Sequence, residues 1–149
     1  MTDIEDLIDK LNSSSKHEIY WLGAADKIQI SNLENALMLT FPEDFKVFLE
    51  KTGGGGVIEQ EISGIEDNNY LAEFGGTIFY DTNYCRNEFS LPDNLIVIYF
   101  KDDEICWCID TSENNKGVVV SFDLFSKKIA KNLFLSFYDF FKEYVELRC

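Results

Sequence analysis

Hydrophobic and polar residues alternate along the chain with two periods, one typical of helices and one typical of strands. Near the N-terminus, apolar residues recur at positions 4, 7, 8 and 11, so the spacing predicts an amphipathic helix over residues 3–11. The same period recurs near the C-terminus, where Ser136 opens a helix with Asp139 at its third position. The apolar face of that last helix carries mostly aromatic rings, which we assign to core packing.

Two shorter helices are predicted between residues 31 and 53. Ser31 and Glu34 have the spacing of a capping box, so we expect a helix to begin at Ser31 and to end near residues 39–40. Pro42 then fits the start of a further helix, because its fixed φ suits the first helical turn. Gly53 follows Lys51 and is the expected C-terminal cap of this helix.

Strand-like patterns fill most of the second half. The predicted strands cover residues 57–62, 77–80, 95–100, 104–110 and 117–122. The last three follow one another across short polar turns, which indicates an antiparallel meander. Residues 81–89 fit either a helix or a loop, and the mixed pattern of residues 123–133 leaves room for a short helix.

The order of these elements predicts the fold class. Helices lie at both ends and strands lie in one block, which is typical of α+β proteins. We therefore expect a single domain over residues 1–149, with an antiparallel or mixed β-sheet packed with N-terminal and C-terminal helices. The composition agrees, since 46% of the residues are hydrophobic and disordered chains have low hydrophobicity.

Charge adds the strongest functional signal. The chain has 27 acidic and 13 basic residues, a net charge of −14. Residues 52–104 hold 11 acidic and 2 basic residues, a net charge of −9, whereas residues 117–149 have a net charge of +1. Two interpretations stay open: a solvated surface that keeps the protein in solution, or a specific acidic binding surface.

This charge bears on the class of partner. Phosphate groups repel an acidic surface, so we expect no direct binding to nucleic acid and no attraction to anionic membranes. A basic protein partner is favoured instead. The acidic N-terminus from Met1 to Asp6 does not resemble a signal peptide, and the longest apolar run is far shorter than a membrane span. We therefore expect a cytoplasmic protein.

Candidate catalytic groups are few. The single histidine, His17, lies in a polar loop and is expected to be exposed, so neither Cys85 nor Cys106 has an evident base. Cys106 and Cys108 would lie side by side on a strand, where a disulfide would strain the backbone, and we expect buried free thiols. Cys149 is terminal and expected to be free. The sequence indicates no enzyme.

Cofactor and metal sites are also weakly supported. The run Gly53–Gly56 lacks the Gly-Lys-Ser/Thr that completes a phosphate-binding loop, so we assign it to a chain reversal and expect no nucleotide. The acidic run 102–104 is expected to be a solvated hairpin tip rather than a cation site. We expect neither a cofactor nor a metal.

The ordered set of motifs resembles the SUKH superfamily (Smi/Knr-like domain), whose founding members include a fungal cell-wall assembly regulator. The matching residues are Gly23, Ile30, Leu33, Glu34, 41–49, 53–56, 62–64, 91–98, 108–110, 117–120 and 137–141. The similarity spans about residues 20–145. Phe41 stands where leucine is usual, and residues 66–76 are unusually acidic, which we associate with partner specificity.

The resemblance implies a non-catalytic fold of helices around a sheet. Many bacterial members resemble immunity proteins that neutralise secreted or contact-dependent toxins, often nucleases, so the implied partner is a basic cognate toxin domain. A regulatory or scaffold interaction module of the same fold is the alternative. The acidic segment and two tyrosines supply the candidate partner-binding residues. They are Glu59, Glu61, Glu66, Asp67, Tyr70, Glu73, Tyr80, Asp102, Asp103 and Glu104.

Overall fold

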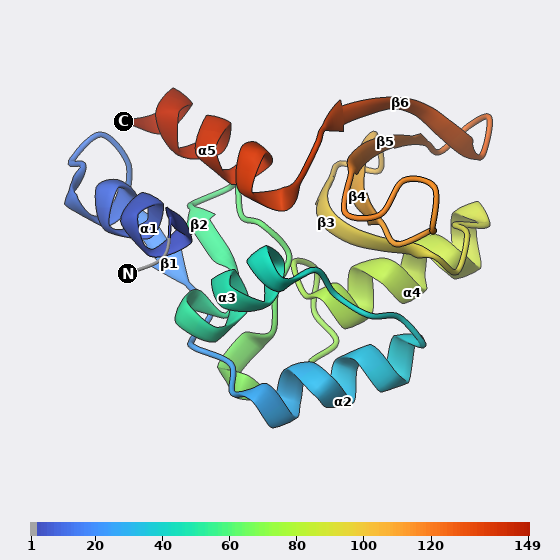
Figure 1. Ribbon diagram of the computed structural model, residues 1–149, viewed down its shortest axis with the longest axis horizontal. Coiled ribbons are helices and arrows are strands. Elements are labelled where there is room, and N and C mark those ends of the chain that lie inside the picture. The colour runs from blue at the N-terminus through green and yellow to red at the C-terminus, as the bar shows by residue number, and fades with distance from the viewer. Residues whose placement is uncertain (1–2) are drawn as a thin grey trace.

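The computed structural model describes residues 3–149, so Met1 and Thr2, the start of the segment compared with signal peptides, lie outside it (Figure 1). Within this range the helices are α1 (Asp3–Ser13), α2 (Lys27–Leu37), α3 (Glu43–Thr52), the short 3-10 helix η1 (Glu66–Asn68), α4 (Ile78–Phe89) and α5 (Phe137–Arg148). The strands are β1 (Ile19–Trp21), β2 (Gly55–Val57), β3 (Leu95–Lys101), β4 (Ile105–Asp110), β5 (Val119–Asp123) and β6 (Lys128–Phe134).

The strands form two antiparallel sheets. One is the short pair β1–β2, and the other is a four-stranded meander in the order β3-β4-β5-β6. The predicted meander is confirmed, and the predicted α+β class is confirmed with it. Both sheets are antiparallel, which settles the choice between antiparallel and mixed pairing.

Alternate residues of β3 divide the apolar interior into two cores. Ile96 and Ile98 face a larger core with the aromatic residues of α3 and α5, whereas Leu95 and Val97 face α4. Figure 1 shows α4 beside β3, and α1, α3 and α5 gathered around β2. The sheet is therefore covered by helices on both faces, and α4 stands apart from the other helices on the face that carries the smaller core.

The predicted helix at each end of the chain is confirmed. In α1 the buried residues are those of the predicted apolar face, at positions 4, 7, 8 and 11. The hydroxyl of Ser136 accepts a hydrogen bond from the backbone N–H of Asp139 at 3.1 Å, so Ser136 is the N-cap of α5. Gly53 ends α3 with φ of 74°, a left-handed conformation that favours glycine. His17 is exposed, as expected.

The predicted start of α2 is wrong. The helix begins at Lys27, four residues before Ser31, and its N-cap is Asp26, whose carboxylate accepts from the N–H of Gln29 at 2.8 Å. Asn68 holds the other carboxylate oxygen of Asp26 at 3.0 Å. Glu34 does not reach back to Ser31; it accepts a hydrogen bond from the N–H of Phe41.

Three further segments differ from their predictions. Strand β2 ends at Val57 and a turn follows, with Glu59 at φ of 73°, so Glu59 and Glu61 do not share a strand face. Residues 77–80 do not form a strand; Thr77 caps α4 and accepts from the N–H of Tyr80. Residues 123–133 contain most of β6 rather than a short helix. The segment 81–89, for which helix and loop were both left open, is helical and belongs to α4.

Two glycine-containing segments, around Gly53 and around Gly64, cross at close range. The N–H of Ile65 donates to the carbonyl oxygen of Gly53 at 2.7 Å, and the carbonyl of Gly64 accepts from the N–H of Ile78 at 2.8 Å. A Cβ atom on Gly64 would overlap the carbonyl oxygen of Gly53. The crossing therefore joins the end of α3 to the start of α4 through backbone atoms that leave no room for a side chain.

Candidate functional site

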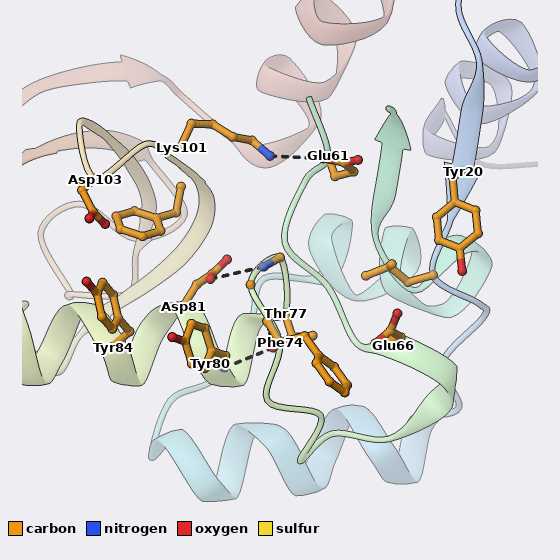
Figure 2. A pocket seen from close by; sticks show the side chains of 14 residues that line it. Tyr20, Glu61, Glu66, Phe74, Thr77, Tyr80, Asp81, Tyr84, Lys101 and Asp103 are labelled. Carbon is orange, nitrogen blue, oxygen red and sulfur yellow. Dashed lines mark hydrogen bonds and ion pairs between the residues drawn. The ribbon is translucent and has the colours of Figure 1, made fainter. Parts of the chain in front are cut away.

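A cleft of about 490 Å³ opens between α4, β3 and the segments around β1 and β2 (Figure 2). Its ring-bearing residues are Tyr20, Phe74, Tyr80, Tyr84 and Phe100. Its charged residues are Glu61, Glu66, Asp81, Lys101 and Asp103. We call this the acidic–aromatic cleft. Four carboxylates against one lysine, among the described residues that line it, give it the same sign of charge as residues 52–104 as a whole.

The aromatic wall of the cleft is built on α4 and β3. Tyr80 and Tyr84 are four residues apart on α4, so their side chains are neighbours on one face of the helix. Their rings are stacked, with centroids 5.8 Å apart and an interplanar angle of 11°. Tyr84 also packs against Phe100 of β3, at 5.9 Å between centroids. These contacts hold flat ring faces in fixed positions beside the carboxylates.

Glu61 carries the cleft's internal ion pair. The Nζ atom of Lys101 lies 3.4 Å from a carboxylate oxygen of Glu61, and the backbone N–H of Glu59 donates to the other oxygen at 2.9 Å. Burial opposes ionisation of Glu61, but the backbone hydrogen bonds and Lys101 outweigh it, so the pKa of Glu61 lies below its ordinary value. Lys101 is therefore already occupied by Glu61.

Glu66 and Asp103 stand at opposite ends of the cleft. Figure 2 shows Asp103 beside Tyr84 at one end and Glu66 near Tyr20 at the other. Neither carboxylate takes part in an ion pair with residues 3–149. Both are thus available to a cation supplied from outside the chain.

Asp81 lies on the cleft floor and is almost fully buried, with 2% of its surface exposed. Its carboxylate accepts hydrogen bonds from the hydroxyl of Ser63 at 2.7 Å and from the backbone N–H of Gly76 at 3.3 Å. Figure 2 shows the second of these bonds. Burial raises the pKa of Asp81 to about 6, although these hydrogen bonds and Lys101 act in the opposite direction. Asp81 therefore carries a charge at neutral pH that burial makes unfavourable.

Replacing Asp81 with asparagine is expected to stabilise the protein more at neutral pH than at acid pH. The pKa of Asp81 is about 6 in the folded state and 3.8 ordinarily. At pH values between these two, the folded state holds a proton that the unfolded state has lost, so the stability of the wild type falls as pH rises through this range. The difference amounts to on the order of 2–3 kcal/mol, at about 1.4 kcal/mol per pKa unit. Urea denaturation of both proteins at about pH 4 and about pH 7 measures it. An offset between them that is the same at both pH values would contradict this reasoning.

The structure gathers four of the ten sequence-predicted residues into the acidic–aromatic cleft: Glu61, Glu66, Tyr80 and Asp103. Glu73 lines an adjoining hollow of about 370 Å³ that shares Tyr80 and Tyr84 with the cleft. The remaining five residues are outside both hollows: Glu59, Asp67, Tyr70, Asp102 and Glu104. Tyr70 is half-buried and packs against the larger core, which leaves little of its ring for a partner.

Sequence analysis missed several cleft residues. They are Tyr20, Phe74, Asp81, Tyr84, Phe100 and Lys101. The sequence contains a signal for one pair, since Tyr80 and Tyr84 are four residues apart and would be neighbours on a helix. Interpreting residues 77–80 as a strand hid this pairing. Lys101 and Phe100 could not be assigned without knowing that the end of β3 lies against α4.

Three of the four cysteines, Cys85, Cys106 and Cys108, form a buried cluster, and none of the three lines the cleft. The Sγ atom of Cys106 lies 4.0 Å from that of Cys85 and 3.7 Å from that of Cys108, and all four cysteines are free thiols. Hydrogen bonding to Cys106 and burial raise the pKa of Cys85 well above its ordinary value, and a contact with Cys108 raises the pKa of Cys106. These thiols stay protonated, which is the opposite of what a nucleophile requires.

Two further tests concern metals and membranes. Within residues 3–149, no three or more His, Cys, Asp and Glu side chains are arranged to hold a metal ion. Asp102 and Asp103 instead form the tip of the β3–β4 hairpin, both with positive φ. Across the same described range, none of the helices combines the length and apolar character needed to span a membrane.

Comparison with known families gives one finding. The family model SUKH_5, described as SMI1-KNR4 cell-wall, matches residues 4–146 of the 149-residue chain. The match extends from α1 to within three residues of the C-terminus, and it includes every segment that lines the acidic–aromatic cleft.

Proposed function

The chain belongs to the SUKH (SMI1-KNR4) family, and from this premise we propose that it is an immunity protein that binds and neutralises a cognate toxin domain. The proposed partner is basic, as a nuclease is, and the acidic–aromatic cleft is the proposed contact surface. Family members are not typically catalytic, and we propose that this chain also acts by binding alone, without a cofactor.

The observation that carries the proposal is the composition of the cleft. Among the residues described, four carboxylates, five aromatic rings and one lysine line the cleft. Aromatic residues are frequent anchors in protein interfaces, and an acidic surface steers a basic partner into productive encounters. A nuclease site is basic because it holds phosphate, so an acidic inhibitor complements it and competes with nucleic acid.

The proposed location is the cytoplasm. The four free thiols are compatible with a reducing compartment, where disulfides are rare. Direct binding to nucleic acid is not part of the proposal, because a net charge of −14 repels phosphate. Membrane association is not part of it either, since anionic lipid surfaces also repel this charge.

The test is co-purification with a toxin-like domain encoded by a neighbouring gene, together with an assay of that domain's toxicity. We expect stable binding that silences toxicity and weakens as salt is raised. Failure to bind any such domain would overturn the proposal. Binding without loss of toxicity would favour the regulatory or scaffold module instead.

A pair of triple variants locates the surface. Glu61→Gln, Glu66→Gln and Asp103→Asn remove three cleft carboxylates, whereas Asp67→Asn, Asp102→Asn and Glu104→Gln remove three carboxylates outside the cleft. Both triples change the net charge equally. We expect the cleft triple to slow association by roughly tenfold or more at low salt, and the control triple by about twofold or less. Equal effects would mean that total charge matters and the cleft does not.

A further inference from the structure

We propose that the end of the acidic–aromatic cleft formed by Tyr80, Tyr84, Phe100 and Asp103 receives a single arginine side chain of the partner protein. This inference rests on the proposed function, since it takes the cleft to be the partner-binding surface. It adds the chemistry of the group that enters and the residues that would hold it.

The ring geometry supplies a stacking surface. Tyr84 contacts three other rings: it stacks on Tyr80 at 5.8 Å, meets Phe100 at 5.9 Å with a tilt of 58°, and meets Phe89 edge-on at 6.0 Å. Tyr80 is 38% exposed, so part of this surface remains open to solvent. A cation above the face of an aromatic ring is attracted by the ring's quadrupole, and most strongly where water is excluded.

The carboxylate of Asp103 lies beside these rings. The negative charge of Asp103 is the main cause that raises the pKa of Tyr84, ahead of burial. The carboxylate therefore interacts electrostatically with the Tyr84 side chain. Asp103 has no ion-pair partner among residues 3–149, and Lys101, the nearest cation along the chain, is paired with Glu61. A cation brought by a partner would therefore meet an uncompensated negative charge.

The hairpin fixes the position of Asp103. Asp102 and Asp103 have φ of 54° and 51°, and the N–H of Glu104 donates to the carbonyl of Lys101 at 3.0 Å, which closes a two-residue turn. The turn follows directly from β3, which also carries Phe100. The carboxylate and the ring are thus held on one short hairpin, which limits the ordering needed on binding.

This arrangement suits arginine better than lysine. A guanidinium is planar, so it can stack on a ring face while two of its N–H groups donate to one carboxylate. An ammonium ion is compact and strongly hydrated, and it gains less from a flat ring. The site combines both features that a guanidinium uses, namely the stacked rings and the unpaired carboxylate.

The test is an NMR titration of the 149-residue chain with blocked tripeptides, acetyl-Gly-X-Gly-amide, in which X is arginine, lysine or citrulline. We expect the arginine peptide to bind in the millimolar range, about threefold or more tighter than the lysine peptide. Citrulline keeps the planar shape without the charge, and it should cause no saturable shift. The shifts should centre on the side-chain signals of Tyr84 and Phe100 and on the amide of Asp103.

Two variants test the residues. Asp103→Asn should weaken binding of the arginine peptide by about fivefold or more, whereas Asp102→Asn, in the same turn but outside the cleft lining, should leave it within about twofold. Equal binding of the citrulline peptide, equal effects of the two variants, absence of saturable shifts, or shifts confined to other parts of the protein would each overturn the inference.

The outcomes separate this inference from the proposed function. If the neighbouring toxin domain binds and is silenced but the arginine peptide does not bind, the immunity role stands and arginine recognition at this site is wrong. If the arginine peptide binds as described but no toxin domain does, the recognition chemistry stands and the immunity role is wrong.

Discussion

Gly64→Ala is expected to lower the free energy of unfolding by about 4 kcal/mol or more, or to prevent folding, because the new side chain has no space. Its Cβ atom would overlap the carbonyl oxygen of Gly53 and lie 2.5 Å from the Cα atom of Gly54. Both are backbone atoms, which cannot rotate away as a side chain could. The overlap could be relieved only if the two segments moved apart, which would break the hydrogen bond from the N–H of Ile65 to the carbonyl oxygen of Gly53.

Gly75→Ala is the matched control. Apart from Gly75 itself and its two neighbours in the chain, no residue has an atom within 4 Å of a Cβ built on Gly75, which lies between Gly64 and α4 and lines the cleft. We expect this variant to differ from the wild type by less than about 1 kcal/mol. Urea denaturation followed by far-ultraviolet circular dichroism measures both variants. Similar midpoints for Gly64→Ala and Gly75→Ala would show that the crossing tolerates expansion and that the steric argument is wrong.

Phe48→Ala is expected to lower the free energy of unfolding by about 3–5 kcal/mol. Phe48 is fully buried, and its ring lies 4.9 Å from that of Phe141 and 5.0 Å from that of Phe137, between ring centroids. It also meets Trp21 edge-on at 6.1 Å. The side chain therefore joins α3 to α5 and to β1, and truncation leaves a cavity among rigid rings that cannot collapse to fill it.

Phe125→Ala removes the same atoms from a side chain that is 91% exposed. We expect a change within about 0.5 kcal/mol for this control. Thermal and urea denaturation of both variants give the comparison. A loss of less than about 1.5 kcal/mol for Phe48→Ala would indicate that the larger core repacks around the missing ring, which would contradict the close-packed arrangement of α3 and α5.

The sequence predicted elements well where one face of the element is buried. The apolar periods of α1, α3 and α5, and the apolar run of β3, follow directly from burial of those faces. Strand β6 gave no such signal because its first five residues are exposed, and its pairing with β5 defines it. A strand at the edge of a sheet can have few buried side chains, so hydrophobic periodicity does not identify it.

Local capping signals were ambiguous where distant residues decide between them. Both Asp26 and Ser31 are suitable N-caps, and residues 27–30 alternate as a strand would. Asp26 prevails in the structure, where Asn68, 42 residues away, holds its carboxylate and also accepts from its backbone N–H. No window of sequence around α2 contains that information.

The candidate site was predictable in its charge and not in its shape. The acidic middle segment and Tyr80 were identified from the sequence, but the cleft depends on the crossing at Gly53 and Gly64 and on the packing of α4 against β3. These are contacts between residues far apart in the chain. They place Glu61, Glu66 and Asp103 along one cleft and leave Tyr70 half-buried against the core.

Most of the carboxylates of the cleft and most of its rings come from different kinds of structure. Three of its carboxylates, at positions 61, 66 and 103, lie in the segments that connect the longer helices and strands, position 66 in the short helix η1, whereas Tyr80, Tyr84 and Phe100 belong to α4 and β3. Substitutions in connecting segments have small effects on folding, and such segments vary most readily in evolution. The charge pattern of this surface can therefore diverge rapidly between lineages, following changes in an opposing protein, while the scaffold beneath it is inherited unchanged.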